Sequence, residues 1–147
     1  MSDHPFIQHL KKDHEKQKQL GKELSESTDL SIRKEVRQQL YEALYPHIMG
    51  EEASFFAYLT KSSVEDIRDQ ALEGLQEHHV AKIVLKELMK LNIDSDVFKA
   101  KAKVLDELNR HHIEEEEGGL FKVLQKMSTQ DLDELFKKYE ETEEKEK

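Results

Sequence analysis

The chain has 147 residues, no cysteine and a formal net charge of -9 at pH 7. A nucleic-acid-binding protein needs a basic face to hold the phosphate backbone, so this charge argues against that class of function. Without cysteine the chain forms no disulfide, iron-sulfur cluster or thiolate nucleophile, and any metal must be held by nitrogen and oxygen ligands.

The composition predicts a single all-α domain. Glycine and proline are scarce, with five and two copies, and the helix formers Leu, Glu, Lys, Gln and Ala dominate. No apolar run approaches the ~18 residues that a membrane span needs, and the segment Met1 to Leu20 lacks the uninterrupted apolar core of a secretion signal. We therefore expect a cytoplasmic protein with neither a membrane nor a nucleic acid as partner.

The first helix is predicted to begin at Pro5 and to end near Glu26. Asp3 or His4 before the proline is typical of a helix start, because proline at the first helical position loses no hydrogen bond. Residues at spacings of three and four then form one inward face, on which His14 interrupts the apolar stripe. This face comprises Ile7, Leu10, His14, Gln17, Gly21 and Leu24.

A second helix is predicted to follow the polar segment 25–31 and to run to about Thr60. His47 and Glu51 lie four residues apart in its second half, so they share one face. Pro46 removes a backbone donor just before His47 and should kink the helix, which either aims the imidazole or only bends the helix round the core. Candidate N-caps are Ser27, Thr28, Asp29 and Ser31.

A third helix is predicted to open at residues 63–66, where Ser, Val, Glu and Asp resemble a capping box, and to end near Asn92. Its inward face carries His78 between Leu75 and Ala81. The neighbouring histidine is out of phase with this face. The third helix therefore contributes one inward histidine, like the first two.

Asp94 or Ser95 is expected to cap a fourth helix, which again has ionisable residues on its apolar face. His112 and Glu116 lie in phase with the leucines around them, whereas His111 does not. Their spacing repeats that of the histidine and glutamate on the second helix. The shared face comprises Leu105, Leu108, His112, Glu116, Leu120 and Val123.

The C-terminal part is predicted to contain a short amphipathic helix, Leu132 to Tyr139, that packs on the bundle. A second box-like cap, at residues 128–131, precedes it. Residues 140–147 are charged except for one threonine and are expected to form a frayed tail. We therefore place the folded domain at residues 1–139.

Short connections near residues 28, 62 and 93 predict that successive helices are antiparallel neighbours, in an up-down-up-down four-helix bundle. Measured from these turns, the four inward histidines share one layer to within little more than a helical turn, and the two glutamates lie one turn further along. A buried carboxylate must be neutralised, paired or bound to a metal, so we predict a metal site. The alternative, a metal-free interaction bundle, requires the buried histidines to be fortuitous. The candidate ligands are His14, His47, Glu51, His78, His112 and Glu116.

The other histidines and several glutamates are expected outside this layer. His79 and His111 would become ligands only if the helical register were shifted by one residue. The histidines expected to face solvent are His4, His9, His79 and His111, and the glutamates expected on the solvated face are Glu52, Glu114, Glu115 and Glu117.

Four motifs carry a resemblance to a known family: Asp13-His14, His47 with Glu51, Glu77-His78, and His112 to Glu116 leading into Leu120-Phe121. Over residues 4–127 the chain resembles the hemerythrin-like family, also called the hemerythrin HHE cation-binding domain. The resemblance implies an up-down four-helix bundle around a non-haem di-iron centre. It also implies that His14, His47, His78 and His112 are terminal ligands, with Glu51 and Glu116 as bridging carboxylates.

The sequence departs from the oxygen carriers of that family at two places. Those proteins have two histidines one turn apart on the third helix, whereas the positions one turn from His78 are Gly74 and Lys82. Their fourth helix places an aspartate five residues after its histidine, whereas here the in-phase group is Glu116 at four, with Glu117 at five as the alternative. These departures argue against a plain oxygen carrier.

Two classes of function fit a centre with two irons. We favour a module that binds or senses O₂, NO or iron itself; the alternative is an enzyme that reduces O₂ or peroxide and so protects against oxidative or nitrosative stress. Imidazoles stabilise iron(II) and leave coordination positions open, while manganese and zinc are less favoured metals. No acid or base beyond the ligands is apparent, and Tyr41, Tyr45 and Tyr58 are interpreted as packing residues.

Metal binding should stabilise the fold, because only the folded arrangement brings the ligands together. The metal-free protein should therefore be less stable than the metal-bound protein. We further expect it to lose stability as the pH falls, because Glu51 and Glu116 share a buried layer with four imidazoles.

Overall fold

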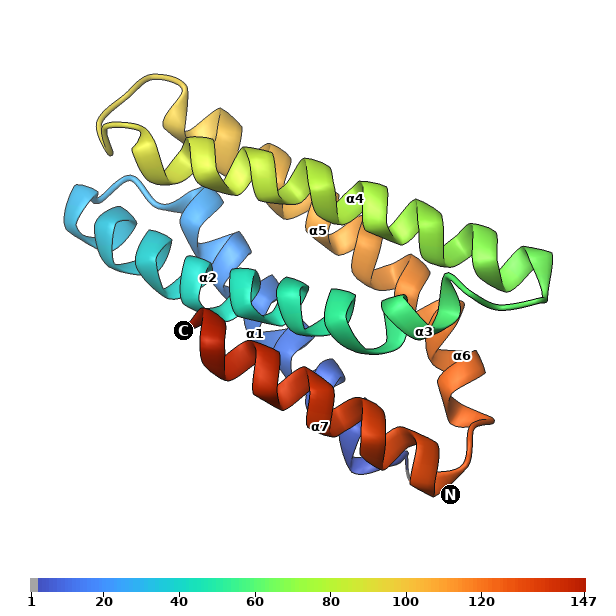
Figure 1. The fold of residues 1–147 in the computed structure, drawn as a ribbon. Helices are drawn as coiled ribbons and strands as arrows, with labels where there is room; N and C mark the ends of the chain where they lie inside the picture. The colour runs from blue at the N-terminus through green and yellow to red at the C-terminus, as the bar shows by residue number, and fades with distance from the viewer. Residues whose placement is uncertain (1–2) are drawn as a thin grey trace.

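Four long helices form an antiparallel bundle in the computed structural model, which describes residues 3–147 (Figure 1). They are α1 Pro5–Glu26, α2 Leu30–Glu51, α4 Glu65–Lys90 and α5 Phe98–Gly118. Helix α1 packs against α2 and α5, and α4 packs against the same two helices. The described residues contain no strand, and among them no helix combines the length and apolar character needed to cross a membrane. The predicted all-α, up-down-up-down bundle is confirmed.

The first two helices begin where the sequence predicts, each on a side chain that accepts a backbone hydrogen bond. At α1 the acceptor is His4 Nδ1, 3.0 Å from the backbone nitrogen of Phe6. At α2 it is Asp29 Oδ1, 2.9 Å from the nitrogen of Ser31 and 3.1 Å from that of Ile32. These caps satisfy donors that the first helical turn leaves without partners.

The starts of α4 and α5 differ from prediction. Helix α4 begins at Glu65 without a side-chain cap, so residues 63–66 do not form the predicted capping box. Helix α5 also begins without a side-chain cap. Its first residue is Phe98, which lies further along the chain than the predicted cap at Asp94 or Ser95 implies. Just before these helices, Ser62 Oγ accepts from the Val64 backbone nitrogen at 3.1 Å and Ser95 Oγ accepts from the Val97 nitrogen at 3.3 Å.

The predicted second helix changes its geometry immediately after Glu51. Helix α2 continues through Pro46, and the departure from α geometry is a π-helical turn, η1 Glu52–Phe56, followed by the short helix α3 Ala57–Leu59. The wider turn lets the consecutive residues Ser54, Phe55 and Phe56 all be buried. Ser54 Oγ donates to the Gly50 carbonyl at 2.7 Å. The irregular segment therefore brings two phenylalanines into the core beside Glu51.

The predicted fourth helix is interrupted at Gly119. This residue has φ -123° and ψ -82°, outside the helical region, and separates α5 from α6 Leu120–Gln125. A Cβ atom at Gly119 would lie 3.0 Å from the Glu115 carbonyl oxygen and would collide with Gln70. The break sends Leu120 and Phe121 back into the core.

The C-terminal helix α7 Thr129–Glu146 is longer than the predicted segment Leu132 to Tyr139. It lies along α2 and η1, outside the four-helix ring (Figure 1). Residues 140–146 belong to this helix, so the prediction of a frayed tail from residue 140 is wrong. Helix α7 begins on the Ser128 hydroxyl, as predicted, and buries three side chains, Leu132, Leu135 and Tyr139.

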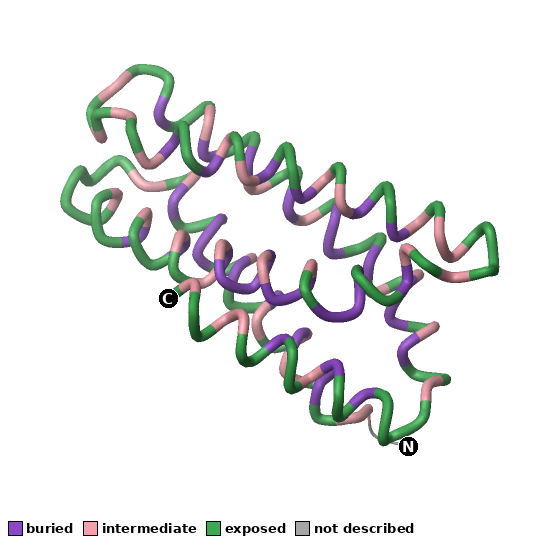
Figure 2. Tube along the Cα trace, viewed as in Figure 1, coloured by how far each residue is buried: buried purple, intermediate pink, exposed green. Residues whose placement is uncertain are grey.

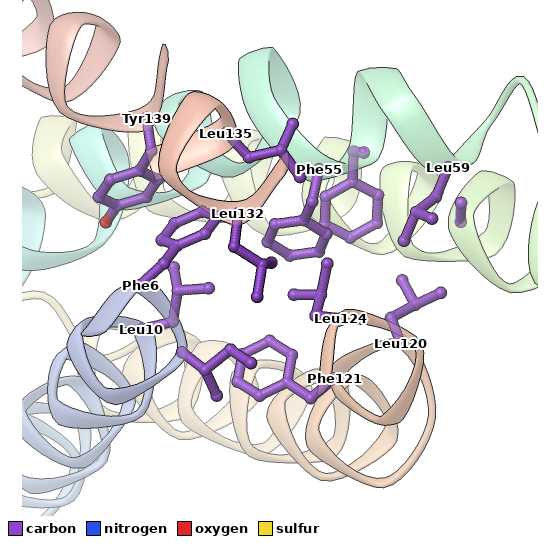
Figure 3. Packing of buried hydrophobic residues seen from close by; sticks show 13 residues of the cluster. Phe6, Leu10, Phe55, Leu59, Leu120, Phe121, Leu124, Leu132, Leu135 and Tyr139 are labelled. Carbon is purple, nitrogen blue, oxygen red and sulfur yellow. The ribbon is translucent and has the colours of Figure 1, made fainter. Parts of the chain in front are cut away.

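Two apolar clusters fill the bundle, one on each side of the layer that contains the predicted ligands. On α1, Leu10 belongs to the first cluster and Leu20 to the second, with His14 between them. Figure 2 shows the buried residues along the inner faces of the helices. The first cluster (Figure 3) comprises Phe6, Ile7, Leu10, Phe55, Phe56, Leu59, Ala71, Leu120, Phe121, Leu124, Leu132, Leu135 and Tyr139, and the second comprises Leu20, Leu24, Val36, Leu40, Leu44, Ile48, Ala81, Leu85, Leu88, Phe98, Ala102 and Leu105.

The close approach of α7 to α2 depends on Gly50. A Cβ atom at this position would lie 2.7 Å from two ring carbons of Tyr139, whereas a Cβ at Gly118 would meet nothing within 4 Å. Gly50→Ala should therefore destabilise the protein by about 1–3 kcal/mol through overpacking, although alanine is the better helix former. Gly118→Ala, the matched control, should be neutral or stabilising. Urea denaturation measures both, and equal midpoints for the two variants would show that α7 does not need this contact.

Candidate metal centre

The six predicted ligands form one buried cluster in the middle of the bundle. Each of the four long helices contributes at least one of them, because their in-phase positions all face the bundle axis. None is more than 7% exposed. The cluster consists of His14 from α1, His47 and Glu51 from α2, His78 from α4, and His112 and Glu116 from α5.

The two glutamates lie between two pairs of histidines. Glu51 Oε2 is 3.1 Å from His47 Nε2, and its other oxygen, Oε1, is 3.2 Å from His78 Nε2. Glu116 is placed in the same way, with Oε1 3.3 Å from His14 Nε2 and Oε2 2.8 Å from His112 Nε2. Each carboxylate thus presents one oxygen to each histidine pair.

Two overlapping groups of four residues can each hold a metal ion. The first joins the pair His14 and His47 to both glutamates, and the second joins the pair His78 and His112 to the same glutamates. Within each group, one ligand atom from every residue lies within 4.8 Å of the others. The geometry therefore offers two cation positions that share both carboxylates.

The hydrogen bonding within the cluster is incomplete. All four carboxylate oxygens of Glu51 and Glu116 are buried and have no hydrogen-bond donor in the described part of the chain, and His47 Nε2 also has no partner. Leaving buried carboxylates without compensation costs several kcal/mol for each ion. Cations bound between the histidine pairs would compensate them, and a set of nitrogen and oxygen donors fits such ions. The residues present therefore fit a metal centre.

Four outer carboxylates orient the histidines of the cluster. The Nδ1 atom of every cluster histidine lies 2.7 to 3.1 Å from an acidic side chain. A carboxylate that accepts the Nδ1–H bond fixes the ring tautomer and leaves Nε2, which points into the cluster, free to bind a metal. The pairs are Glu117 with His14 at 2.7 Å, Asp13 with His47 at 3.0 Å, Glu52 with His78 at 3.1 Å and Glu77 with His112 at 2.8 Å.

These outer carboxylates connect neighbouring helices in a closed ring. Asp13 links α1 to α2, and Glu52, directly after α2, links that helix to α4. Glu77 links α4 to α5, and Glu117 links α5 back to α1. Each follows or precedes a cluster residue in the sequence, yet each bonds to a histidine on another helix. The prediction that Glu52 and Glu117 belong to the solvated face is wrong, whereas Glu114 and Glu115 are exposed as predicted. On each helix, an acidic residue directly beside one of the cluster residues was the available signal.

A family model described as the hemerythrin HHE cation binding domain matches residues 6–124. The chain belongs to this family. Comparisons with curated proteins and with solved structures gave no significant match. The matched residues include the whole cluster and its outer carboxylates, so the buried histidines and glutamates are those of a cation-binding domain. Helix α7 lies outside the matched region.

The histidines outside the cluster take no part in this HHE domain's inner layer. His79 and His111 are exposed, so the register shift that would make them ligands does not occur. His111 instead lies 3.0 Å from Glu115 at the surface. His4 caps α1 and contacts Asp133 at 2.7 Å.

Phe56 occupies the place where a fifth histidine would project. A Cβ atom at Gly74, one turn before His78, would lie 2.6 Å from the Phe56 ring and 3.7 Å from His112 Cε1. At the position one turn after His78, Lys82 binds the outer carboxylate Glu52 at 3.1 Å. The π-helical turn therefore fills, with an apolar ring, the space beside the second histidine pair.

Helix α7 adds Tyr139, which the sequence interpretation overlooked. Its hydroxyl lies 2.8 Å from Asp13 Oδ2, 2.9 Å from His47 Nδ1 and 3.0 Å from Glu143 Oε2. Burial and the negative charges of Asp13, Glu143 and Glu51 raise the pKa of Tyr139, which keeps the phenol protonated. The only sequence signal was its place on the apolar face of the amphipathic C-terminal helix. Tyr139 thus connects the added helix to the histidine layer.

In the metal-free cluster, ion pairs shift the pKa values of the ligands more than burial does, and in the opposite direction. Burial lowers the pKa of His47, but the charge of Glu51 and the hydrogen bond to Asp13 raise it to about 9. Burial likewise lowers the pKa of His112, while the charge of Glu116 and the hydrogen bond to Glu77 raise it to about 10. Burial raises the pKa of Glu51, yet His47 and the other neighbours hold it well below its usual range. Metal binding at neutral pH must therefore displace protons from imidazolium groups.

The outer carboxylates should control metal affinity. Glu117→Gln removes the charge that faces His14 Nδ1, and loss of such an outer-shell partner weakens metal binding by about 10- to 100-fold. Glu114→Gln is the control, since it makes the same charge change on an exposed residue of the same helix. Competition with a chelator measures both affinities. Equal affinities would show that the Glu117 contact does not orient the histidine.

Between pH 6 and pH 9, the stability of the metal-free protein should change in the direction opposite to the one expected from sequence. His47 and His112 have pKa values raised above 6.5, so their contribution to stability is complete below about pH 6.5 and is lost as the pH rises through 9 to 10. The lowered pKa of Glu51 adds a contribution that is present above 4.5 and is lost only in stronger acid. The urea midpoint of metal-free protein should be higher at pH 6 than at pH 9. A midpoint at pH 9 equal to or above that at pH 6 would contradict this ion-pair arrangement.

Proposed function

We propose that this protein holds two iron ions and uses them to bind or sense O₂, NO or iron itself. The observation that carries the proposal is the placement of Glu51 and Glu116, each with one oxygen toward each histidine pair. A carboxylate shared in this way offsets the charge of two cations held close together. One iron is assigned to His14 and His47, and the other to His78 and His112.

The donor set favours iron among the metals available to a chain without thiolates. Each position has two imidazoles and one oxygen from each of the two shared carboxylates, so an iron(II) ion that accepts six ligands would keep positions open for a small ligand. The outer carboxylates hold the imidazole tautomers, and the two apolar clusters pack on either side of the layer. Manganese and zinc are the competing metals, which elemental analysis distinguishes.

The second position is the one that a small ligand can reach. A cavity of about 490 Å³ is lined by His112 and Glu116 but by neither histidine of the first pair. Phe56 forms an apolar wall of this cavity, which suits a neutral diatomic molecule such as O₂ or NO. The first pair lies between Phe121, whose ring stacks 5.6 Å from that of His14, and Tyr139. We therefore assign ligand binding to the position held by His78 and His112.

A di-iron enzyme that reduces O₂ or peroxide is the second candidate. The observation that favours it is Tyr139, an oxidisable side chain whose hydroxyl lies 2.9 Å from His47 Nδ1. Binding and catalysis differ in their kinetics. A binding or sensing protein takes up one ligand per centre reversibly, whereas an enzyme consumes O₂ or peroxide over many turnovers in the presence of a reductant.

Metal-free protein reconstituted anaerobically with iron(II) should bind close to two irons per chain, because two donor groups share the glutamates. After oxidation it should show ligand-to-iron charge-transfer absorption in the near ultraviolet. Elemental analysis with an iron assay measures the stoichiometry. One iron per chain, or none, would contradict the di-iron proposal.

Variants of neighbouring residues on α5 provide the control for this experiment. His112→Ala and Glu116→Ala should lower iron content, whereas His111→Ala and Glu115→Ala change exposed residues and should leave it close to two per chain. The reverse pattern would mean that a different face of α5 holds the metal.

A further inference from the structure

The cavity beside the second histidine pair is lined by acidic residues. Its walls come from α4, α5, α6 and Phe56, and it contains five glutamates. No lysine or arginine of the described chain lines it. The glutamates are Glu73 and Glu77 from α4 and Glu114, Glu115 and Glu116 from α5.

The glutamates that line the cavity differ in how deeply they are buried. Glu73, Glu114 and Glu115 are exposed, and neither Glu73 nor Glu114 has an ion-pair partner within the described residues. Glu116, at the inner end, is 3% exposed, and both its carboxylate oxygens lack a hydrogen-bond donor. The cavity thus runs from surface carboxylates to a buried carboxylate that has no hydrogen-bond donor among the described residues.

Away from this cavity, packed side chains cover the cluster of candidate ligands. Phe121 stacks on the ring of His14, and Phe55 packs on Phe121 with ring centroids 6.1 Å apart. Tyr139 lies over His47, with ring centroids 5.8 Å apart. At the mouth of the cavity, by contrast, Gly118 has no side chain, and a Cβ atom there would meet nothing within 4 Å.

We propose that this acidic cavity is the route by which a hydrated divalent cation reaches the centre, drawn by Glu73, Glu114 and Glu115 and received by Glu116. The inference rests on the proposed function, because it requires that the cluster bind metal. Clefts lined by charge of one sign raise the local concentration of counter-ions and accelerate their association. The same charges repel anions and leave neutral diatomic molecules unaffected. The cavity therefore selects by charge what enters the layer.

The rate of metal uptake tests this route separately from metal affinity. Metal-free protein is mixed with cobalt(II) at low ionic strength, and the visible absorption of bound cobalt is followed by stopped flow. The variant Glu73→Gln/Glu114→Gln/Glu115→Gln removes three charges from the mouth but no residue of the cluster. Its uptake should be on the order of tenfold slower than wild type and less sensitive to salt, while the cobalt content at saturation stays the same.

Two further variants test whether uptake depends on the net charge of the protein, on the charge at the mouth or on the open space there. Glu134→Gln/Glu140→Gln/Glu141→Gln makes the same change of net charge on exposed residues of α7 and should load at the wild-type rate. Gly118→Trp changes no charge but fills the mouth, and it should also slow uptake without lowering the final content.

Full cobalt binding at the wild-type rate in both the triple mouth variant and Gly118→Trp would overturn the route alone. A slowing in the α7 control equal to that in the mouth variant would also overturn it, because net charge and not the cavity would then control uptake. Failure of the wild type to bind cobalt or iron at any time would instead overturn the proposed function.

Discussion

The structure depends on the compensation of two buried carboxylates. Glu51 and Glu116 lie at the centre of the bundle with no hydrogen-bond donor for any of their four oxygens within the described residues. Such groups are costly in an apolar interior, and here imidazole nitrogens lie 2.8 to 3.3 Å from their oxygens. In the metal-free protein, protonated imidazoles offset this cost. The raised pKa values of His47 and His112 reflect this pairing. A metal ion would take the place of those protons, so folding, protonation and metal binding share the same six side chains.

The outer carboxylates extend that constraint to the whole bundle. Each bonds across to a histidine on a neighbouring helix, so the four contacts close a ring around the axis. Movement of any one helix would change the orientation of an imidazole on the next. The metal layer and the helix packing are therefore coupled, and an apolar cluster packs on either side of the layer.

Two departures from regular structure adapt the HHE bundle in this chain. The π-helical turn after Glu51 places Phe56 against Gly74, where a further histidine could otherwise project. Helix α7, outside the region matched by the family, approaches α2 at Gly50 and adds Tyr139 to the shell around His47. One side of the centre is thus closed by an added helix, while the other opens to the acidic cavity. This asymmetry distinguishes the two proposed metal positions.

The sequence alone determined the helical fold and the six residues of the inner cluster, because both follow from local periodicity and from distances to turns. A helix has only one inward face, so the sequence could identify the inward residues of α5 as His112 and Glu116 instead of His111 and Glu115. The partners across the bundle could not be predicted in this way. Which carboxylate meets which Nδ1 atom, how closely α7 approaches Gly50 and where the π-helical turn falls depend on side chains from different helices, and only tertiary packing decides their mutual placement. Glu52, Glu117 and Tyr139 acquire their roles there for that reason.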